Sequence, residues 1–280
     1  MISFTFFGTS DFSVYTLDAL KNAGFLPSHI VTTPDSPQGR KLIITPTKVK
    51  VWAIENNIPF TQPESLKSEE TLNELKNYQS DVFVVASYGK IIPQNILDIP
   101  KHKTLNIHPS LLPKLRGASP IQTAILQEEK TGVTIMRLDD KMDHGPIVAQ
   151  RELDSENWLT DYATLEKTLG QMGGELLAEI LPDWINGKIE EKEQDHEKAT
   201  YTKKIEKSDG LISLDDTAEK NLRKILAYSV WPGSFFFTKS KGKDIRVIIT
   251  EAKIVDGKLE IVKVIPESKK EMYYRDFLKG

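Results

Sequence analysis

Asn106 and His108 carry side chains that can do chemistry, and they stand two residues apart in the segment NIHPSLLPKLRG. In an extended strand, residues two apart point to the same face, so we expect the amide and the imidazole to lie side by side. An amide N–H beside an imidazole can stabilise an oxyanion as it develops. The pair is therefore a candidate catalytic site, although a single histidine in a sequence is more often structural.

Asp143 could add a carboxylate to this pair. It lies in the segment LDDKMDHGPIVAQ, after a predicted strand and before a Gly-Pro pair at which the backbone turns. A carboxylate near His108 could raise the affinity of the imidazole for a proton, or move protons itself. The alternative interpretation is a solvated loop acid, which also suits Asp139 and Asp140.

The tetrapeptide Ser110–Pro113 (SLLP) places two leucines beside these polar residues. A rigid, apolar loop closed by proline can form a wall for a flat heterocycle. It can equally pack onto a helix as part of the core. Composition alone leaves both interpretations open.

The elements that must position these residues are predicted by the spacing of apolar residues. Short continuous apolar runs alternate with helical periodicity through the first half of the chain, which is typical of an α/β domain with a mostly parallel, doubly wound sheet. The predicted strands are 2–7, 29–33, 82–86, 105–108 and 132–138, and the predicted helices are 12–23, 49–56, 69–77, 121–127 and 165–184. Chemistry in such sheets lies beyond the carboxyl ends of the strands, so segments 8–11, 87–90 and 106–117 are the candidate site.

The pattern changes after residue 184. A polar stretch, 185–202, reads as a linker, and a helix at 218–228 with several strand-like runs predicts a small barrel or sandwich. The run VDGK is a hairpin signal within it. We therefore predict a catalytic domain at 1–184, a linker at 185–202 and a C-terminal domain at 203–280.

Charge is unevenly distributed, although the net charge of the 280 residues is only −3. Residues 203–280 contain 17 Lys and Arg against 12 Asp and Glu, whereas the rest of the chain is acidic. A basic C-terminal part favours a polyanionic partner. A solvated lysine-rich surface is the simpler alternative.

Several classes of protein are excluded or disfavoured by missing features. There is no cysteine, so disulfides, thiolate metal sites and a cysteine nucleophile are excluded. No dinucleotide-binding, P-loop, G-x-S-x-G or H-E-x-x-H motif occurs, and we expect no metal. The sequence lacks a signal peptide pattern and a long apolar span, so we expect no membrane contact and a cytoplasmic location.

The motifs together resemble a known family. FFGTSDF, VVASYGKIIP, NIHPSLLPKLRGASPIQTAI, TGVTIMRLDDKMDHGPI, ATYTKKIEKSDGLI and VWPG occur in the order found in methionyl-tRNA formyltransferases. The similarity runs over nearly the whole chain. The Asn-x-His-x-Ser-Leu-Leu-Pro block with a downstream Asp is shared by the wider 10-formyltetrahydrofolate transferase group, and the ATY and WPG segments favour the tRNA enzymes.

The resemblance implies a Rossmann-like formyltransferase domain followed by an OB-like β-barrel that helps to hold tRNA. It implies transfer of a formyl group from 10-formyltetrahydrofolate to the α-amine of methionyl initiator tRNA, which supports translation initiation. Asn106, His108 and Asp143 match the catalytic trio of the family. By analogy, Asn106 and protonated His108 stabilise the oxyanion, and Asp143 supports His108 and relays the proton.

The resemblance also implies binding residues. The residues matching the folate site are Ser110, Leu111, Leu112, Pro113, Tyr88, Gly89 and Ile91. The segment PDSPQGRKLIITPTKVK matches the tRNA-contacting insertion of the family and is less basic than usual, with Leu42 and Ile43 where lysines are common. The candidate phosphate contacts in it are Arg40, Lys41, Lys48 and Lys50.

Three other functions stay open at this point. A formyltransferase for a small amine, such as an amino sugar nucleotide or glycinamide ribonucleotide, would need the same trio but no basic C-terminal part. A hydrolase that releases formate could share the trio, and a non-catalytic tRNA-binding protein would have no use for it. The basic C-terminal part favours the tRNA enzyme, and we expect a monomer.

Overall fold

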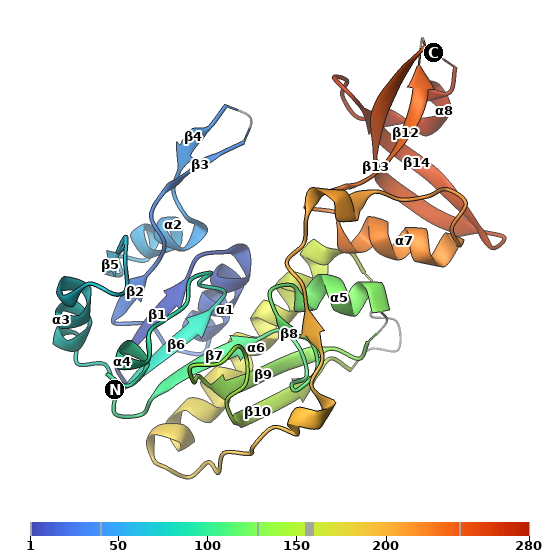
Figure 1. Cartoon of the computed structure of the whole chain (residues 1–280). Coiled ribbons are helices and arrows are strands. Elements are labelled where there is room, and N and C mark those ends of the chain that lie inside the picture. The colour runs from blue at the N-terminus through green and yellow to red at the C-terminus, as the bar shows by residue number, and fades with distance from the viewer. Residues whose placement is uncertain (1, 40, 128, 155–159, 241, 280) are drawn as a thin grey trace. The chain divides into compact units, whose positions relative to one another are not determined.

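The computed structural model describes residues 2–39, 41–127, 129–154, 160–240 and 242–279 (Figure 1). The chain divides into two compact units. The first comprises Met1–Arg116, Thr131–Asp154 and Glu166–Tyr201, and the second comprises Gly117–Lys130, Ser155–Leu165 and Thr202–Gly280. The predicted domain boundaries at 184 and 203 stay a prediction, because a compact unit and a functional domain need not coincide.

A seven-stranded mixed sheet forms the centre of the first unit, in the order β10-β9-β7-β6-β1-β2-β5. Strands β5, β2, β1, β6 and β7 are parallel to their neighbours in this group, whereas β9 and β10 are antiparallel additions at one edge. This confirms the predicted Rossmann-like, mostly parallel sheet. The strands are β1 (Phe4–Gly8), β2 (His29–Val31), β5 (Phe60–Thr61), β6 (Val82–Ala86), β7 (Thr104–His108), β9 (Gly132–Arg137) and β10 (Ile147–Glu152).

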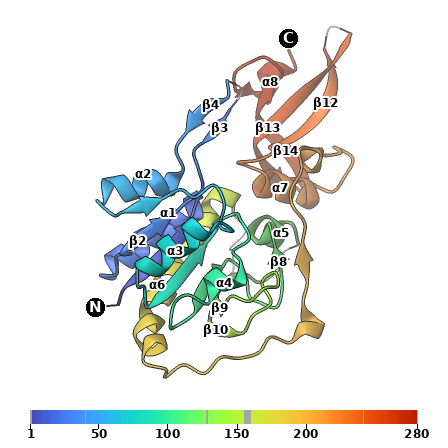
Figure 2. The ribbon, with the colours of Figure 1, turned by 60° about the vertical axis from the view of Figure 1, so that its left-hand side comes forward.

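Helices cover both faces of this sheet (Figures 1 and 2). They are α1 (Asp11–Asn22), α2 (Lys48–Glu55), α3 (Glu69–Asn77), the short α4 (Gln94–Leu97) and α6 (Tyr162–Ile185). Hydroxyl side chains begin two of them: Thr47 accepts a hydrogen bond from the Lys50 amide, and Ser68 accepts one from the Thr71 amide. Such caps satisfy backbone donors that have no partner inside the helix.

Helix α6 runs unbroken through the GQMGG segment, whose glycines weaken the sequence-based prediction of a helix. A Cβ atom on Gly173 would lie 2.5 Å from Cγ2 of Ile107 in β7, and one on Gly174 would lie 2.5 Å from the carbonyl oxygen of Thr16 in α1. The glycines are therefore needed for close packing of α6 on the sheet and on α1.

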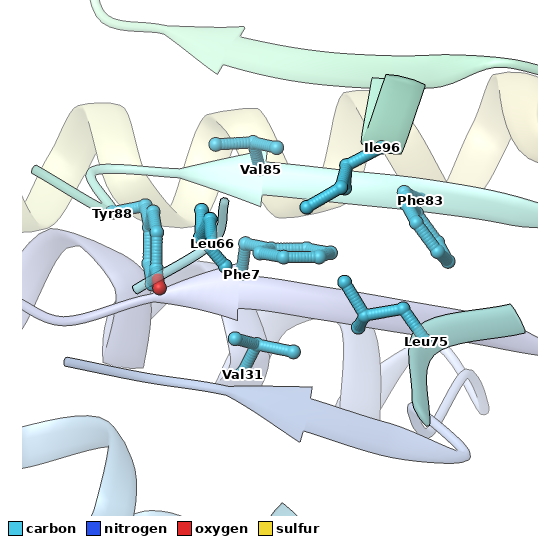
Figure 3. Close-up of a cluster of buried hydrophobic side chains, with 8 residues drawn as sticks. All are labelled: Phe7, Val31, Leu66, Leu75, Phe83, Val85, Tyr88 and Ile96. Atoms are coloured by element: carbon cyan, nitrogen blue, oxygen red, sulfur yellow. The ribbon is translucent and has the colours of Figure 1, made fainter. Parts of the chain in front are cut away.

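The opposite face of the sheet carries a buried apolar cluster, drawn in Figure 3. It joins side chains of β1, β2 and β6 to Leu75 of α3 and Ile96 of α4. Aromatic contacts hold its middle, with the ring centroids of Phe7 and Phe83 5.2 Å apart and those of Phe7 and Tyr88 5.6 Å apart. Burying these side chains supplies much of the stability of the strands that carry the candidate site.

The segment after β2 contains a hairpin that the sequence does not reveal. Strands β3 (Ser36–Gln38) and β4 (Ile43–Thr45) pair antiparallel, with Pro37 opposite Ile44. The residues of β3 are exposed, so no apolar alternation marks it.

The second unit contains a four-stranded antiparallel sheet in the order β12-β13-β14-β15. Its β13–β14 turn is Asp256-Gly257, both with positive φ, as the predicted hairpin signal requires. Helix α7 packs on α5 and contributes Ile225 to a core with Phe236 and Val264. The elements are α5 (Pro120–Gln127), α7 (Ala218–Ala227), β12 (Ser234–Ser240), β13 (Lys243–Val255), β14 (Lys258–Pro266), β15 (Met272–Tyr273) and α8 (Tyr274–Phe277).

Candidate active site

Asn106 and His108 lie on one face of β7, near its carboxyl end, as their spacing predicts. Ile107 between them points to the opposite face, where it contacts α6 at Gly173. His108 is almost fully buried, and Asn106 is 9% exposed. Within the described part of the chain, the side-chain amide of Asn106 has no hydrogen-bond partner. The N–H groups of this side chain are therefore available to a ligand.

Both ring nitrogens of His108 face oxygen atoms. Nε2 lies 3.0 Å from the carbonyl oxygen of Leu115, to which it must donate, because a carbonyl has no proton. Nδ1 lies 3.6 Å from Oδ1 of Asp143. Both ring nitrogens are therefore turned toward acceptor oxygens, one of the backbone and one of a carboxylate.

Asp143 reaches His108 from the loop between β9 and β10. Its φ is +48°, in the left-handed region, and its side chain is largely buried. The carbonyl oxygen of Asp143 accepts a hydrogen bond of 2.9 Å from Nε2 of Gln194. No sequence pattern points to Gln194, which stands in a polar stretch predicted to be a linker.

The SLLP loop is held by its own hydrogen bonds. The Ser110 hydroxyl donates to the carbonyl of Lys114 at 2.7 Å, and the Thr134 hydroxyl donates to the carbonyl of Ser110 at 2.7 Å. Thr134 Oγ1 also accepts from the Leu112 amide, and Nε2 of Gln150 donates to the Leu112 carbonyl at 2.7 Å. The Leu112–Pro113 peptide bond is cis.

These contacts divide the predicted folate residues of this loop into two groups. The side chains of Ser110 and Leu112 are buried in the protein, whereas Leu111 and Pro113 are half-buried. Only the second pair therefore presents side-chain surface outward, and the first pair holds the loop in shape.

The residues after β6 divide in the same way. β6 and β7 are parallel neighbours with Val85 opposite Asn106, so segment 88–91 emerges at the same sheet edge as the SLLP loop. Tyr88 belongs to the apolar cluster of Figure 3, where burial raises the pKa of its phenol to about 12. A Cβ atom on Gly89 would meet open space, and Ile91 is 93% exposed.

The four predicted tRNA contacts are also not equivalent. Arg40 lies outside the described residues. Lys41 is exposed on the hairpin, and Lys48 is largely exposed with Asp11 3.9 Å away. Nζ of Lys50 lies 2.6 Å from Oδ2 of Asp35, in a mostly buried ion pair. Hydrogen bonds from Gln62 and Lys50 hold the pKa of Asp35 below its ordinary value.

Two kinds of feature are absent from the described ranges. No group of three or more His, Asp or Glu side chains there is arranged to hold a metal ion. No helix formed by those residues has the length and apolar character needed to cross a membrane.

Most of the chain matches two family models. Residues 2–181 match the family model of formyl transferases, and residues 204–258 match that of the formyl transferase C-terminal domain. The parallel sheet with Asn106 and His108 at its carboxyl edge lies in the first of these regions, so the chain is a formyltransferase.

The particular family is shown by relatives that match this chain over most of its length. The methionyl-tRNA formyltransferase of Sulfurihydrogenibium sp. is 42% identical over 271 residues, which cover 95% of this chain and 85% of the relative. A second one, from Bacillus licheniformis, is 36% identical and covers 100% of this chain and 95% of its own length. The chain belongs to the methionyl-tRNA formyltransferase family.

Solved structures share the fold at lower identity. The methionyl-tRNA formyltransferase of Clostridium thermocellum superposes with a TM-score of 0.61 at 18% identity, covering 95% of this chain and 99% of that chain. This likeness is to the fold alone, which formyltransferases with different acceptors share.

Proposed function

We propose that this protein transfers the formyl group of 10-formyltetrahydrofolate to the α-amino group of methionyl initiator tRNA and so supports translation initiation. The observation that carries the proposal is the placement of His108 between the Leu115 carbonyl and the Asp143 carboxylate, with the Asn106 amide beside it on β7. This is an arrangement for stabilising negative charge and moving a proton at one point.

In the proposed reaction the neutral amine attacks the formyl carbon, and the carbonyl oxygen of that group gains negative charge. The side-chain amide of Asn106 donates a hydrogen bond to this oxygen, and the positive charge of a protonated His108 stabilises it, because both ring nitrogens already face Leu115 and Asp143. The bond between the formyl carbon and the folate nitrogen then breaks, and a proton lost by the amine is delivered to that nitrogen. Asp143 supports His108 and relays the proton. The products are the formamide and tetrahydrofolate.

The folate donor fits the sheet edge formed by segments 88–91 and 110–113. Ile91, Leu111 and Pro113 offer apolar surface for its flat ring, and the open space at Gly89 lets the ring approach the backbone. Ser110, Leu112 and Tyr88 have inward-facing side chains and act in this proposal by supporting the walls.

The tRNA is proposed to contact the hairpin β3–β4 and the basic C-terminal part. Lys41 and Lys48 are the exposed lysines of this group, so they are the preferred phosphate contacts, with Arg40 beside them in the sequence. Lys50 is already neutralised by Asp35 and contributes less. We assign 1–184 to catalysis, 185–202 to the linker and 203–280 to tRNA binding, in a monomer acting in the cytoplasm.

The decisive experiment compares acceptors. Formyl transfer from 10-formyltetrahydrofolate is measured to charged initiator tRNA, to glycinamide ribonucleotide and to a nucleotide-linked amino sugar. Each is assayed with the wild type, His108→Ala and the control His102→Ala. We expect formylmethionyl-tRNA as the only formylated product, about a hundredfold lower rate for His108→Ala and little change for the control. Transfer to a small amine alone would refute the assignment of Met-tRNA as the acceptor. Release of formate alone would refute the assignment of the protein as a transferase.

A further inference from the structure

One residue of the segment predicted to be a linker is built into the candidate active site. Between residues 182 and 204, all of which the structure describes, Gln194 is the only buried side chain. Its neighbours are charged and exposed, as expected for a surface connection. A buried amide in such a stretch must have its hydrogen bonds satisfied inside the protein.

All the hydrogen-bonding capacity of the Gln194 amide is used. Nε2 donates to the carbonyl oxygens of Asp143 and Gly145, at 2.9 and 2.7 Å. Oε1 accepts from Nε and Nη2 of Arg116, at 3.1 and 2.6 Å. The contact thus joins the linker to the loop that carries the Asp143 carboxylate.

Arg116 determines which way the amide points. A guanidinium can only donate, so Oε1 must face it, and this directs the two N–H groups of Gln194 toward the two carbonyls. Arg116 is itself fixed: it is almost fully buried, its amide donates to the Thr200 carbonyl at 2.9 Å, and its Nη2 lies 2.9 Å from Nδ1 of His196.

Residues of the same segment on either side of Gln194 also contact the loop that carries Asp143. The backbones of Lys192 and Ile147 exchange two hydrogen bonds of 2.8 Å, at the start of β10. The rings of His144 and His196 stack with centroids 4.1 Å apart and planes 7° apart. Residues on both sides of Gln194 are therefore tied to the part of the loop that follows Asp143.

The backbone of Asp143 needs such support. A residue other than glycine at a φ of +48° adopts a sparsely populated conformation, which persists only when the surroundings enforce it. The Asp143 carboxylate lies 3.6 Å from His108, longer than a strong hydrogen bond, so a small shift of the loop changes this contact.

We propose that Gln194, oriented by Arg116, is a positioning residue that holds the backbone at Asp143 and Gly145 and thereby keeps the Asp143 carboxylate beside His108. The proposal rests on the proposed function in one respect: it takes Asp143 and His108 to act in the transfer. The segment 185–202 then serves catalysis as well as connecting two parts of the chain.

The test uses the full-length chain and Gln194→Glu. Glutamate has the same size and keeps an oxygen for Arg116, but it has no N–H for the two carbonyls. The matched control is Gln171→Glu, the same change at an exposed position of α6. We expect kcat to fall about tenfold or more in Gln194→Glu, because a misplaced catalytic group is costly, with both KM values changed less than about threefold. The kcat of the control variant should stay within about twofold of the wild-type value.

Two further readouts separate positioning from general destabilisation. In an Asp143→Asn background, Gln194→Glu should lower kcat by less than about twofold, because the residue acts through Asp143. Hydrogen exchange of segment 139–147 should become at least about tenfold faster, while the amides of β7 keep their protection. Unchanged kcat with unchanged exchange would overturn the proposal, and so would equal losses in both backgrounds or faster exchange across the whole sheet. If the wild type did not formylate Met-tRNA, the proposed function would fail, and the exchange measurement would still decide whether Gln194 holds the loop.

Discussion

His108 and Asp143 face each other at 3.6 Å, Nδ1 to Oδ1, in a largely buried setting. The other ring nitrogen of His108 is held by the Leu115 carbonyl at 3.0 Å, so the ring cannot turn away without losing that bond. The distance across the pair is therefore governed by the loop that carries Asp143. Two groups arranged in this way should act as one unit.

We accordingly expect strongly non-additive losses at this pair. Asp143→Asn and His108→Ala should each lower kcat by about two orders of magnitude, since each removes the proton-handling unit. The double variant should fall no more than about tenfold below the weaker single variant. Steady-state formyl transfer measures this, with Asp140→Asn, an exposed acid of the same loop, as the control. Fully multiplicative losses would show that the two residues act separately.

Thr134→Val should loosen the SLLP loop. The substitution keeps the shape of a fully buried side chain but removes the bonds to the Ser110 carbonyl and the Leu112 amide. Leaving buried backbone groups without partners costs about 1 to 3 kcal/mol. We expect a lower free energy of unfolding and about a tenfold higher KM for the folate donor, with kcat changed less. Thr123→Val, which loses only a bond to the Ser119 carbonyl just before α5, should leave this KM unchanged.

Gly173→Ala tests the contact behind the candidate site. Helix propensity alone predicts that alanine stabilises α6 by about 1 kcal/mol. The added Cβ would lie 2.5 Å from Ile107, however, and the resulting displacement is expected to destabilise the protein by about 2 kcal/mol and to lower kcat. Urea denaturation measures whether the free energy of unfolding of the variant is lower or higher than that of the wild type. Combining the change with Ile107→Ala should produce a smaller loss than the sum of the two, and a stabilised single variant would contradict the packing argument.

His29 should make stability depend on pH. Burial lowers the pKa of its imidazole from 6.5 to about 4, with the Glu74 carboxylate opposing the shift. Above pH 6.5 the ring is neutral in both the folded and the unfolded chain. As the pH falls from 6.5 to 4 the unfolded chain binds the proton first, so the free energy of unfolding declines by up to about 3 kcal/mol.

His29→Phe removes this titration while keeping an aromatic ring to stack on Tyr78, whose ring centroid lies 3.8 Å away. In this variant the free energy of unfolding should fall between pH 6.5 and 4 by about 3 kcal/mol less than in the wild type. His29→Gln, which cannot titrate either, should show the same flattening whatever its effect at neutral pH. A decline as steep as that of the wild type in both variants would contradict the prediction.

Elements with a local signature were predicted well from the sequence. The predicted strand 82–86 and helix 69–77 coincide with β6 and α3, because a continuous apolar run and a capped amphipathic helix report their own burial. The hairpin β3–β4 was missed, since its first strand is exposed and contains Pro37. The glycines of α6 lowered expectations for a helix that they in fact allow to pack closely.

Local sequence patterns suffice to predict the α/β class and the shared face of Asn106 and His108, because both depend on local composition and on the two-residue period of a strand. Only the folded structure shows that Asp143 faces His108, that Gln194 and Arg116 contact its loop, and that Lys50 is paired with Asp35 while Lys41 is exposed. It also decided that Tyr88 packs into the core while Ile91 stays outside. These relationships depend on contacts between segments distant along the chain, and no local pattern encodes which of many polar residues will meet after folding.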